Sequence, residues 1–251
     1  MKQIIVNIII GVIVLVVVKA HSVELSIVAG SPHQEYDFVR EVLVERLKLQ
    51  DSRQSSISDH TNRIFYFAQK NGVNSIISIE VLTRTGSGSY EQVMEGMRFA
   101  ASRSKIILNA LGPLTNSWCQ VMASHPSVVF MTPVNSDGKI IDASKFPDCR
   151  AANILVVSGL DASLTDLHST QDRGDIVRLA VPFVNLKSPI RSASSRAYGM
   201  GMVAGKMAQL IRANPELAGA ELVNSFFKTN TIYLEKLEGK VKAGRAFVTI
   251  E

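Results

Sequence analysis

The feature of this chain that most restricts its fold is an alternation of short apolar runs, rich in Val and Ile, with longer segments that carry apolar residues at helical spacing. The apolar runs predict strands that are buried on both faces, as in a parallel sheet. The predicted strands are residues 23–29, 75–82, 105–108, 127–131, 153–158 and 176–180. Strands that alternate with helices predict an α/β fold with a mainly parallel, twisted sheet and helices on both faces.

The segments between the strands supply the helices. The predicted helices are residues 35–49, 63–70, 91–102, 116–123, 197–213 and 217–227. Asn214 is expected to cap the last of these, and Pro215 suits its first turn. With 251 residues, 46% of them hydrophobic, and no internal repeat or low-complexity linker, residues 21–251 are predicted to form a single domain with one large core.

The first 20 residues differ from the rest of the chain. Lys2 precedes an apolar run from Ile4 to Val18, and Ala20 provides a small residue at a plausible cleavage position, which is the pattern of a signal peptide. The run of about 15 residues is shorter than the roughly 20 that a membrane-spanning helix needs. Residues 1–20 are therefore predicted to be a signal peptide and the mature chain to be exported, periplasmic or secreted. An uncleaved membrane anchor is the alternative.

Charge and cysteine content exclude several kinds of site. The net charge of +5 comes from Lys and Arg scattered along the chain, which gives no indication of a nucleic-acid partner. The two cysteines, Cys119 and Cys149, either form a disulfide in an oxidising compartment or stay apart. Neither has metal-ligand spacing, so no metal and no cofactor are predicted.

Residues 195–205 open a predicted helix and are dense in small side chains. Considered for packing alone, the glycines would let neighbouring backbone approach a central helix closely. The segment also resembles the nucleophile region of the subtilisin-like serine peptidases, the subtilases, whose pattern Gly-Thr-Ser-Met-Ala-x-Pro-x-Val-Ala-Gly begins a long buried helix. Aligned on Val203-Ala204-Gly205, the nucleophilic serine falls on Ala197. A methyl group cannot attack a carbonyl.

Other segments resemble the same family in the same order. Asn135 follows a predicted strand at the place of the family's oxyanion-hole asparagine, whose amide N–H would donate to the developing alkoxide. An ordinary turn at residues 135–138 is the alternative. Residues 153–161 and 175–182 resemble two further strands of the family. The resemblance covers nearly all of the chain after residue 20 and implies a three-layer subtilisin-like fold.

Two segments resemble the edges that flank the substrate in subtilases, where an extended peptide is held by main-chain hydrogen bonds. One is a Gly-Ser loop before a predicted helix, and the other follows the strand predicted at residues 105–108. The candidate substrate-binding residues are Gly86, Ser87, Gly88, Ser89, Ala110, Leu111 and Gly112. Because the Gly-Ser loop lacks the Gly-Lys-Ser/Thr ending of a phosphate cradle, a plain flexible loop is its other interpretation.

The remaining triad positions also differ from the family pattern. The family's His-Gly-Thr-His segment is matched best at Asp59-His60-Thr61, and aligning the threonines puts Asp59 in the position of the base. His60 then lies one step along and is expected to face elsewhere on the helix start; a shift of local register would make His60 the base. Ala29 stands in place of the family's aspartate at the end of the first strand.

A working triad needs a serine that attacks, a histidine that takes its proton and an aspartate that orients the ring. With Ala29, Asp59 and Ala197 at those positions, the resemblance implies an inactive relative, a pseudoprotease with a peptide-binding or regulatory role. Its expected partner is an extended peptide or protein segment, and a membrane is a partner only if the leader is retained. Two alternatives stay open: an active but divergent subtilisin-like serine endopeptidase, and an exported α/β binding or structural protein unrelated to proteolysis.

Overall fold

The computed structural model of the chain describes residues 23–49, 58–83 and 87–248. Within these ranges nine strands form one sheet in the order β2-β3-β1-β4-β5-β6-β7-β9-β8. Neighbouring strands are parallel except for the antiparallel pair β8 and β9. The strands are β1 (Val23–Ala29), β2 (Leu43–Lys48), β3 (Ile76–Glu80), β4 (Ser104–Asn109), β5 (Val129–Pro133), β6 (Ile154–Gly159), β7 (Val177–Val181), β8 (Ile232–Tyr233) and β9 (Arg245–Ala246).

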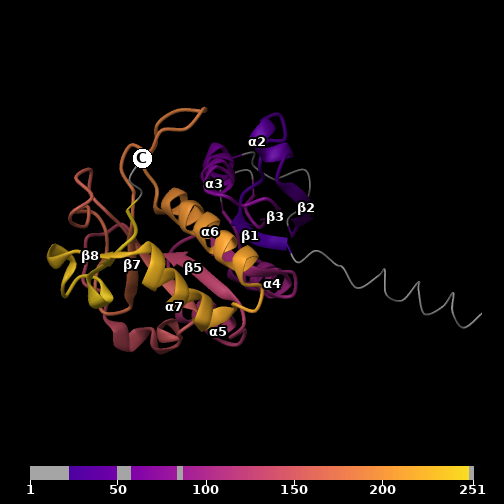
Figure 1. The fold of residues 1–251 in the computed structure, drawn as a ribbon. Helices are drawn as coiled ribbons and strands as arrows, with labels where there is room; N and C mark the ends of the chain where they lie inside the picture. Colours follow the sequence, from indigo (N-terminus) through magenta and orange to yellow (C-terminus); the bar gives the residue numbers. More distant parts are fainter. Residues whose placement is uncertain (1–22, 50–57, 84–86, 249–251) are drawn as a thin grey trace, which may run out of the picture.

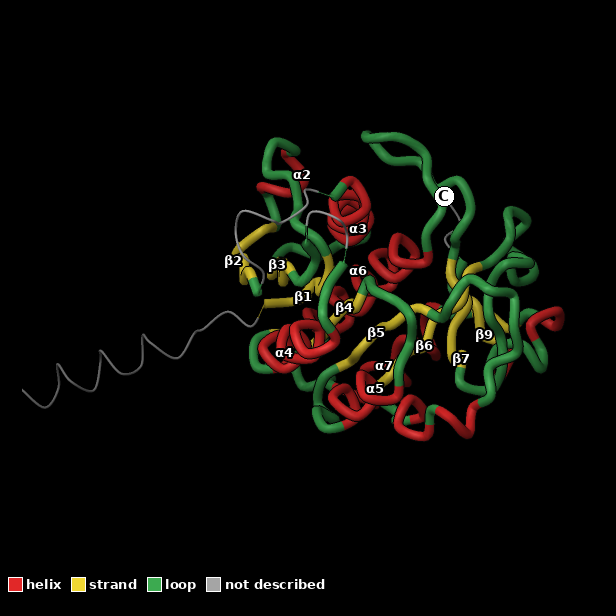
Figure 2. The backbone as a smooth tube through the Cα atoms, turned by 180° about the vertical axis from the view of Figure 1, so that it is seen from behind, coloured by secondary structure: helices red, strands yellow, loops and turns green. Residues whose placement is uncertain are grey.

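Helices cover both faces of the sheet. α3, α6 and α7 pack on one face (Figure 1), whereas α4 and α5 pack on the other (Figure 2). The helices are α2 (Asp37–Arg40), α3 (Asp59–Lys70), α4 (Tyr90–Ala101), α5 (Asn116–Ala123), α6 (Arg196–Ala213) and α7 (Gly219–Asn230). The predicted fold class, α/β with a mainly parallel sheet between two helical layers, is confirmed.

The apolar runs of the sequence form strands because both of their faces are buried. In β1, Leu25 and Ile27 contribute to the core under α3 and α6, while Val28 contributes to the core under α4 and α5. β3, β5 and β6 are buried at every position. Burial of each such side chain stabilises the fold by about 1.5–3 kcal/mol, so two-sided strands dominate the energetics of the core.

The helix predicted over residues 35–49 is wrong. The chain forms only the short α2 there and then β2, which pairs in parallel with β3 along the edge of the sheet. The apolar residues at Val42, Leu43 and Leu47 fit helical spacing, but they also fit a half-buried edge strand. Pairing with β3 decides between the two, and a single sequence carries no direct signal for that pairing.

The end of the chain also departs from the prediction. α7 begins at Gly219 after the N-cap residue Ala218, so Asn214 does not cap it. Asn214 instead ends α6, and its side-chain oxygen accepts from the Glu216 N–H. The two-residue strands β8 and β9 were not predicted, because so short a segment carries no period.

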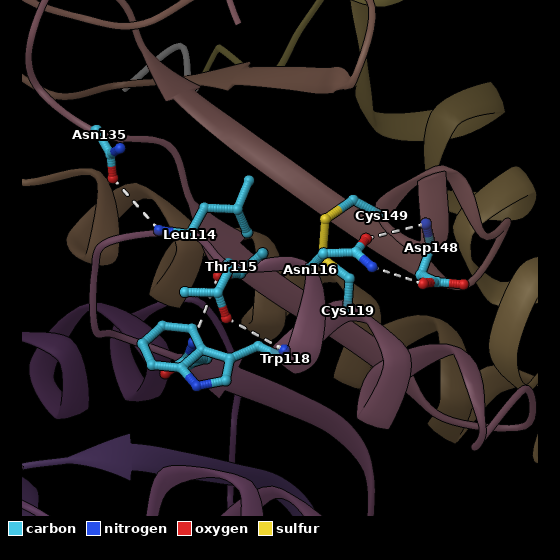
Figure 3. Close-up of a disulfide and its surroundings, with 10 residues drawn as sticks. Leu114, Thr115, Asn116, Trp118, Cys119, Asn135, Asp148 and Cys149 are labelled. Carbon is cyan, nitrogen blue, oxygen red and sulfur yellow. Dashed lines mark hydrogen bonds between the residues drawn. A yellow bond between two sulfur atoms is a disulfide. The ribbon is translucent and has the colours of Figure 1, made fainter. Parts of the chain in front are cut away.

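Cys119 and Cys149 form a disulfide, with their Cα atoms 4.8 Å apart. The bond joins α5 to the 3₁₀ turn Pro147–Arg150 (Figure 3). Beside it the Asn116 side chain donates to the Asp148 carboxylate at 2.8 Å and accepts from the Asp148 N–H at 3.3 Å. The question that the sequence left open is settled in favour of a bridge.

The signal peptide predicted at residues 1–20 lies outside the described residues. Within the part of the chain that is described, no helix has both the length and the apolar character needed to cross a membrane.

Candidate functional site

The predicted site residues lie at one edge of the sheet. Ala29 ends β1, Asn135 follows β5, and residues 110–112 follow β4. Asp59 and Ala197 lie in the first turns of α3 and α6. The carboxyl ends of parallel strands meet at this edge, which is where open α/β proteins bind ligands.

The loop after β1 is tied to the start of α3. The Ser58 N–H donates to the Ser31 carbonyl at 2.9 Å, and the His33 N–H donates to Asn62 Oδ1 at 2.6 Å. These bonds bring the end of β1 and the first turn of α3 together, so two of the three predicted triad positions are neighbours.

Ala29 supplies no carboxylate, but a carboxylate lies beside it on the adjacent strand. Glu80 pairs with Ala29 across β1 and β3 and is fully buried. Its Oε1 accepts from Arg46 Nε at 2.6 Å, and its Oε2 accepts from the Ser31 hydroxyl at 2.7 Å. Both oxygens are therefore occupied by partners other than a histidine.

α3 and α6 pack closely because glycines of α6 face the backbone of α3. A Cβ on Gly201 would lie 3.0 Å from the Ile64 carbonyl oxygen, and a Cβ on Gly205 would lie 2.5 Å from that of Asn71. The small residues in this segment thus have the packing role that close backbone approach requires. Their packing brings the first turns of the two helices into contact.

His60 faces the start of α6. Its Nδ1 lies 3.1 Å from the Tyr198 hydroxyl, and the two rings are 5.2 Å apart. Arg63 Nη1 donates to the same hydroxyl at 3.3 Å. The second residue of α3 thus lies on the side that α6 covers, where it contacts Tyr198.

These contacts and the burial of the ring determine the charge of the imidazole. An arginine can only donate, so the Tyr198 oxygen accepts from Arg63, whereas the direction of its bond with His60 Nδ1 depends on the tautomer of the ring. Burial, together with the positive charges of Arg63 and Arg196, lowers the pKa of His60 to about 4. At neutral pH the ring is therefore uncharged.

The surroundings of His60 differ from those of a triad histidine. In the triad, Nδ1–H donates to a carboxylate and Nε2 is free to take a proton. In His60, Nδ1 faces the Tyr198 hydroxyl instead, and no carboxylate of the described residues lies within ion-pair distance of the ring.

The start of α6 is also linked to the loop after β5. Arg196 Nη1 donates to the Asn135 carbonyl at 3.3 Å, to Ser136 Oγ at 2.6 Å and to Gln171 Oε1 at 2.6 Å. Burial lowers the pKa of Arg196 to about 10, which still leaves it charged at neutral pH. The fourth predicted position, Asn135, is therefore linked to the first turn of α6 through the Arg196 side chain.

The Asn135 side chain contacts the loop before α5 through its oxygen and not through its amide nitrogen. Its Oδ1 accepts from the Leu114 N–H at 3.3 Å (Figure 3), so the amide nitrogen is the group that remains to donate elsewhere. The oxyanion-hole role of Asn135 stays a prediction.

The position predicted for the nucleophile, Ala197, is buried. Ala197 is 3% exposed, and its backbone N–H donates to Ser195 Oγ at 3.2 Å as the cap of α6. Ser195 is therefore the N-cap residue of α6, which gives its hydroxyl a structural role.

The two predicted edges of the peptide groove follow β3 and β4, on either side of β1 in the sheet. Ser87, Gly88 and Ser89 are exposed, as is Gly112, whereas Ala110 and Leu111 are half-buried. Gly86 lies outside the described residues.

Three residues at this site were missed from the sequence: Arg63, Arg196 and Tyr198. Arg196 and Tyr198 flank Ala197, and Arg63 lies one helical turn after Asp59. A charged residue buried to 4% exposure, as Arg63 is, signals a site only once its burial is known. In the described ranges no three His, Cys, Asp or Glu side chains are grouped so that they could hold a metal ion.

Comparison with known proteins gives a likeness of fold. No protein-family model matches the sequence, and no curated protein matches it. Among solved structures, the chain is similar to that described as "Crystal structure of a cold adapted subtilisin-like serine proteinase", with a TM-score of 0.74. The match covers 91% of this chain and 89% of that chain at 16% identity. The fold is therefore subtilisin-like, as predicted; at this identity the likeness shows the fold alone.

Proposed function

We propose that this chain is an exported, catalytically inactive subtilisin-like domain that holds an extended peptide or protein segment without cutting it. The observation that carries the proposal is the first turn of α6, where Ala197 presents a methyl group and the only adjacent imidazole, among the described residues, is tied to Tyr198. A site without an attacking group and without a base loses about six orders of magnitude in turnover, a magnitude that comes from subtilisin itself.

The Tyr198 hydroxyl does not replace the missing serine. It is a hydroxyl placed against a ring nitrogen, which is the arrangement of an activated nucleophile. Tyr198 is, however, 2% exposed and already receives a hydrogen bond from Arg63. A substrate carbonyl has no access to an oxygen that is buried and held on both sides.

Other hydroxyls beside histidines are local turn contacts. Ser124 Oγ lies 3.1 Å from His125 Nδ1, but both groups also contact the Val121 carbonyl at the end of α5. Thr170 Oγ1 lies 2.9 Å from His168 Nδ1, which also accepts from the Thr170 N–H. Each pair is separated by at most two residues of sequence, so neither supports an active centre built from distant elements.

Export is supported by the apolar leader pattern of residues 1–20 and by the disulfide, which forms and persists mainly in oxidising compartments. Retention of a peptide is supported by the exposed loop edges after β3 and β4 at the carboxyl end of the sheet. An extended peptide placed there would gain main-chain hydrogen bonds at both edges.

Peptide binding can be tested at Gly112, which is the better of the two groove glycines to alter. A Cβ at Gly112 would meet only Asn135 Oδ1, at 3.9 Å, whereas a Cβ at Gly88 would lie 2.5 Å from the Val81 carbonyl oxygen. Gly112→Trp therefore places a large side chain at the proposed groove edge, starting from a Cβ that has no close contact. The matched control is Val44→Trp, at a 57% exposed position of the edge strand β2.

The mature protein is screened against an extended-peptide library, and binding of the best peptide is then measured by calorimetry for both variants. We expect Gly112→Trp to weaken binding by at least tenfold and Val44→Trp to leave it unchanged. Absence of any binding peptide would contradict the proposal and favour an α/β structural protein unrelated to proteolysis. Cleavage of the bound peptide would favour the divergent endopeptidase.

A further inference from the structure

A cavity beside α7 is lined by three cations, at the end of the strands opposite the candidate site. The cavity measures about 200 Å³ and is lined by Arg178, Lys242, Arg245, Asn224, Phe227 and Ala243. Arg178 is the second residue of β7 and Arg245 the first of β9, so both lie near the amino ends of these parallel strands. No carboxylate of the described residues lines this space, which we call the basic cavity.

One aromatic ring brings the two arginines together. The guanidinium carbon of Arg245 lies 4.7 Å from the centroid of the Phe227 ring, and that of Arg178 lies 5.5 Å from the same centroid. Burial, and after it the charge of Arg245, lowers the pKa of Arg178. Contact with an aromatic ring attracts each cation, but it does not neutralise either of them.

Both guanidinium groups keep N–H donors for a ligand. Arg178 Nη1 donates to the backbone carbonyls of residues 151, 152 and 154 at 3.2, 2.8 and 2.9 Å, which fixes the group against the start of β6. Arg245 Nη1 makes one long bond, at 3.4 Å, to Thr231 Oγ1. Since an arginine carries five N–H donors, these bonds leave most of the donors of both groups unused by the described residues.

The three cations also lack a counter-ion. None of them forms an ion pair with a described residue, and the nearest hollow, on the other side of Lys242, holds Asp175 together with Arg150. Elsewhere in the chain, Arg103 lies 5.6 Å from the centroid of the Phe99 ring but pairs with Glu45 at 2.8 Å. Three unbalanced positive charges around one small space favour an anion of more than one charge.

We propose that the basic cavity binds a phosphate group, with Arg178 and Arg245 as its main donors and Lys242 as a third positive charge. The planar, forked guanidinium matches the geometry of phosphate oxygens, and lysine contributes as a point charge. The exposed Asn224 on α7 adds a neutral amide donor. The cavity lies away from the proposed peptide groove, so this inference does not depend on peptide binding.

The phosphate can be free inorganic phosphate or the monoester of a larger ligand. Inorganic phosphate, methyl phosphate, acetate and chloride are each titrated into isotope-labelled protein at constant ionic strength, while NMR follows the Arg178 Nε–H signal. The variants are Arg245→Gln and Arg245→Lys, because Arg245 makes only one long hydrogen bond to a described residue and can be replaced with little cost to the fold. The matched control is Arg103→Gln, which removes an arginine that is also placed over a phenylalanine but is balanced by Glu45.

We expect a saturable shift with at least one of the two phosphates and none with acetate or chloride. Arg245→Gln weakens phosphate binding by about tenfold to a hundredfold, the range for a hydrogen bond between charged groups, and Arg245→Lys weakens it less. Arg103→Gln leaves it unchanged. Methyl phosphate binding as tightly as inorganic phosphate assigns the site to a monoester, and weaker binding assigns it to the free ion. A shift that is absent, that acetate or chloride reproduces, or that Arg245→Gln leaves intact overturns the site.

Thermal unfolding gives a second, independent readout. Phosphate stabilises many folded proteins without binding to a site, so the informative quantity is the difference between the wild type and Arg245→Gln. A ligand that binds only the folded state raises the Tm as its concentration rises. We expect phosphate to raise the Tm of the wild type and of Arg103→Gln more than that of Arg245→Gln. Equal gains in all three proteins overturn the site.

Discussion

At the scale of single residues, Tyr198 joins His60 and Arg63. Its buried hydroxyl accepts from Arg63 Nη1 and lies 3.1 Å from His60 Nδ1. His60 Nδ1 therefore has a tyrosine hydroxyl where a triad histidine has a carboxylate.

Replacement of Tyr198 by phenylalanine removes the shared oxygen and leaves His60 Nδ1 and Arg63 Nη1 without that partner. We expect Tyr198→Phe to lower the free energy of unfolding by about 1–3 kcal/mol, the cost of unpaired buried polar groups. Urea unfolding measures it. The control is Tyr233→Phe, whose residue is 60% exposed and bonds only to Glu238 among described residues, with an expected change within about 0.5 kcal/mol. Equal effects of the two substitutions would contradict the buried network.

The pH dependence of stability reports on the same histidine. The folded-state pKa of His60 is about 4, below the ordinary value of 6.5. Between these values the unfolded chain binds more protons, so stability is full above pH 6.5, falls as the pH is lowered and stops falling below about 4. The shift corresponds to a loss of up to about 3 kcal/mol.

Urea unfolding of the wild type and of His60→Asn at pH 7.5 and pH 4 measures this loss, because the carboxylates contribute equally to both proteins. We expect the wild type to lose roughly 2–3 kcal/mol more than the variant over this interval. Equal losses would show that His60 is not held neutral by its surroundings.

The sequence could place the candidate site residues on particular elements, but it could not reveal the side-chain contacts around them. The family pattern placed Ala29, Asp59, Asn135 and Ala197 on elements that meet at one edge of the sheet. It did not identify Arg63, Arg196 and Tyr198, since the contact between His60 and Tyr198 joins residues 138 apart and depends on the way in which α3 and α6 pack.

At the scale of elements, the packing of α3 against α6 assembles the site. Gly205 is the position at which the two helices approach most tightly, because an added Cβ would lie 2.5 Å from the Asn71 carbonyl oxygen and 2.6 Å from its carbonyl carbon. Backbone atoms cannot move aside as a flexible side chain can.

We expect Gly205→Ala to destabilise the protein by about 1–3 kcal/mol, although alanine favours a helix by about 1 kcal/mol over glycine. The matched control is Gly112→Ala, where the added methyl meets nothing closer than 3.9 Å. Thermal and urea unfolding compare the two variants. A stabilised Gly205→Ala would contradict the close approach of α3 and α6.

Elements with a strong local signal could be predicted, and the others could not. β3, β5 and β6 are buried at every position, and they could be recognised because strands buried on both faces form apolar runs in the sequence. α5 was predicted at its observed bounds of Asn116–Ala123. β2 was mistaken for a helix because an edge strand with one buried side has the same apolar spacing over a few residues.

At the scale of the whole molecule, the chain has a subtilisin-like fold, with a mainly parallel sheet between two helical layers. The core depends on two-sided apolar strands, and Ala29 and Ala197 belong to that core. A fold of this kind can host different functions, so the peptide-holding role remains a proposal about the edge residues and does not follow from the fold.

The central claim, a peptide held but not cut, is tested most directly by a fluorophosphonate probe applied to the purified mature protein, with intact-mass and peptide-mapping readouts and an active serine peptidase labelled in parallel. The account predicts an unchanged mass for this protein and full labelling of the active enzyme. A mass increase mapped to a serine at the α3–α6 edge would contradict the account.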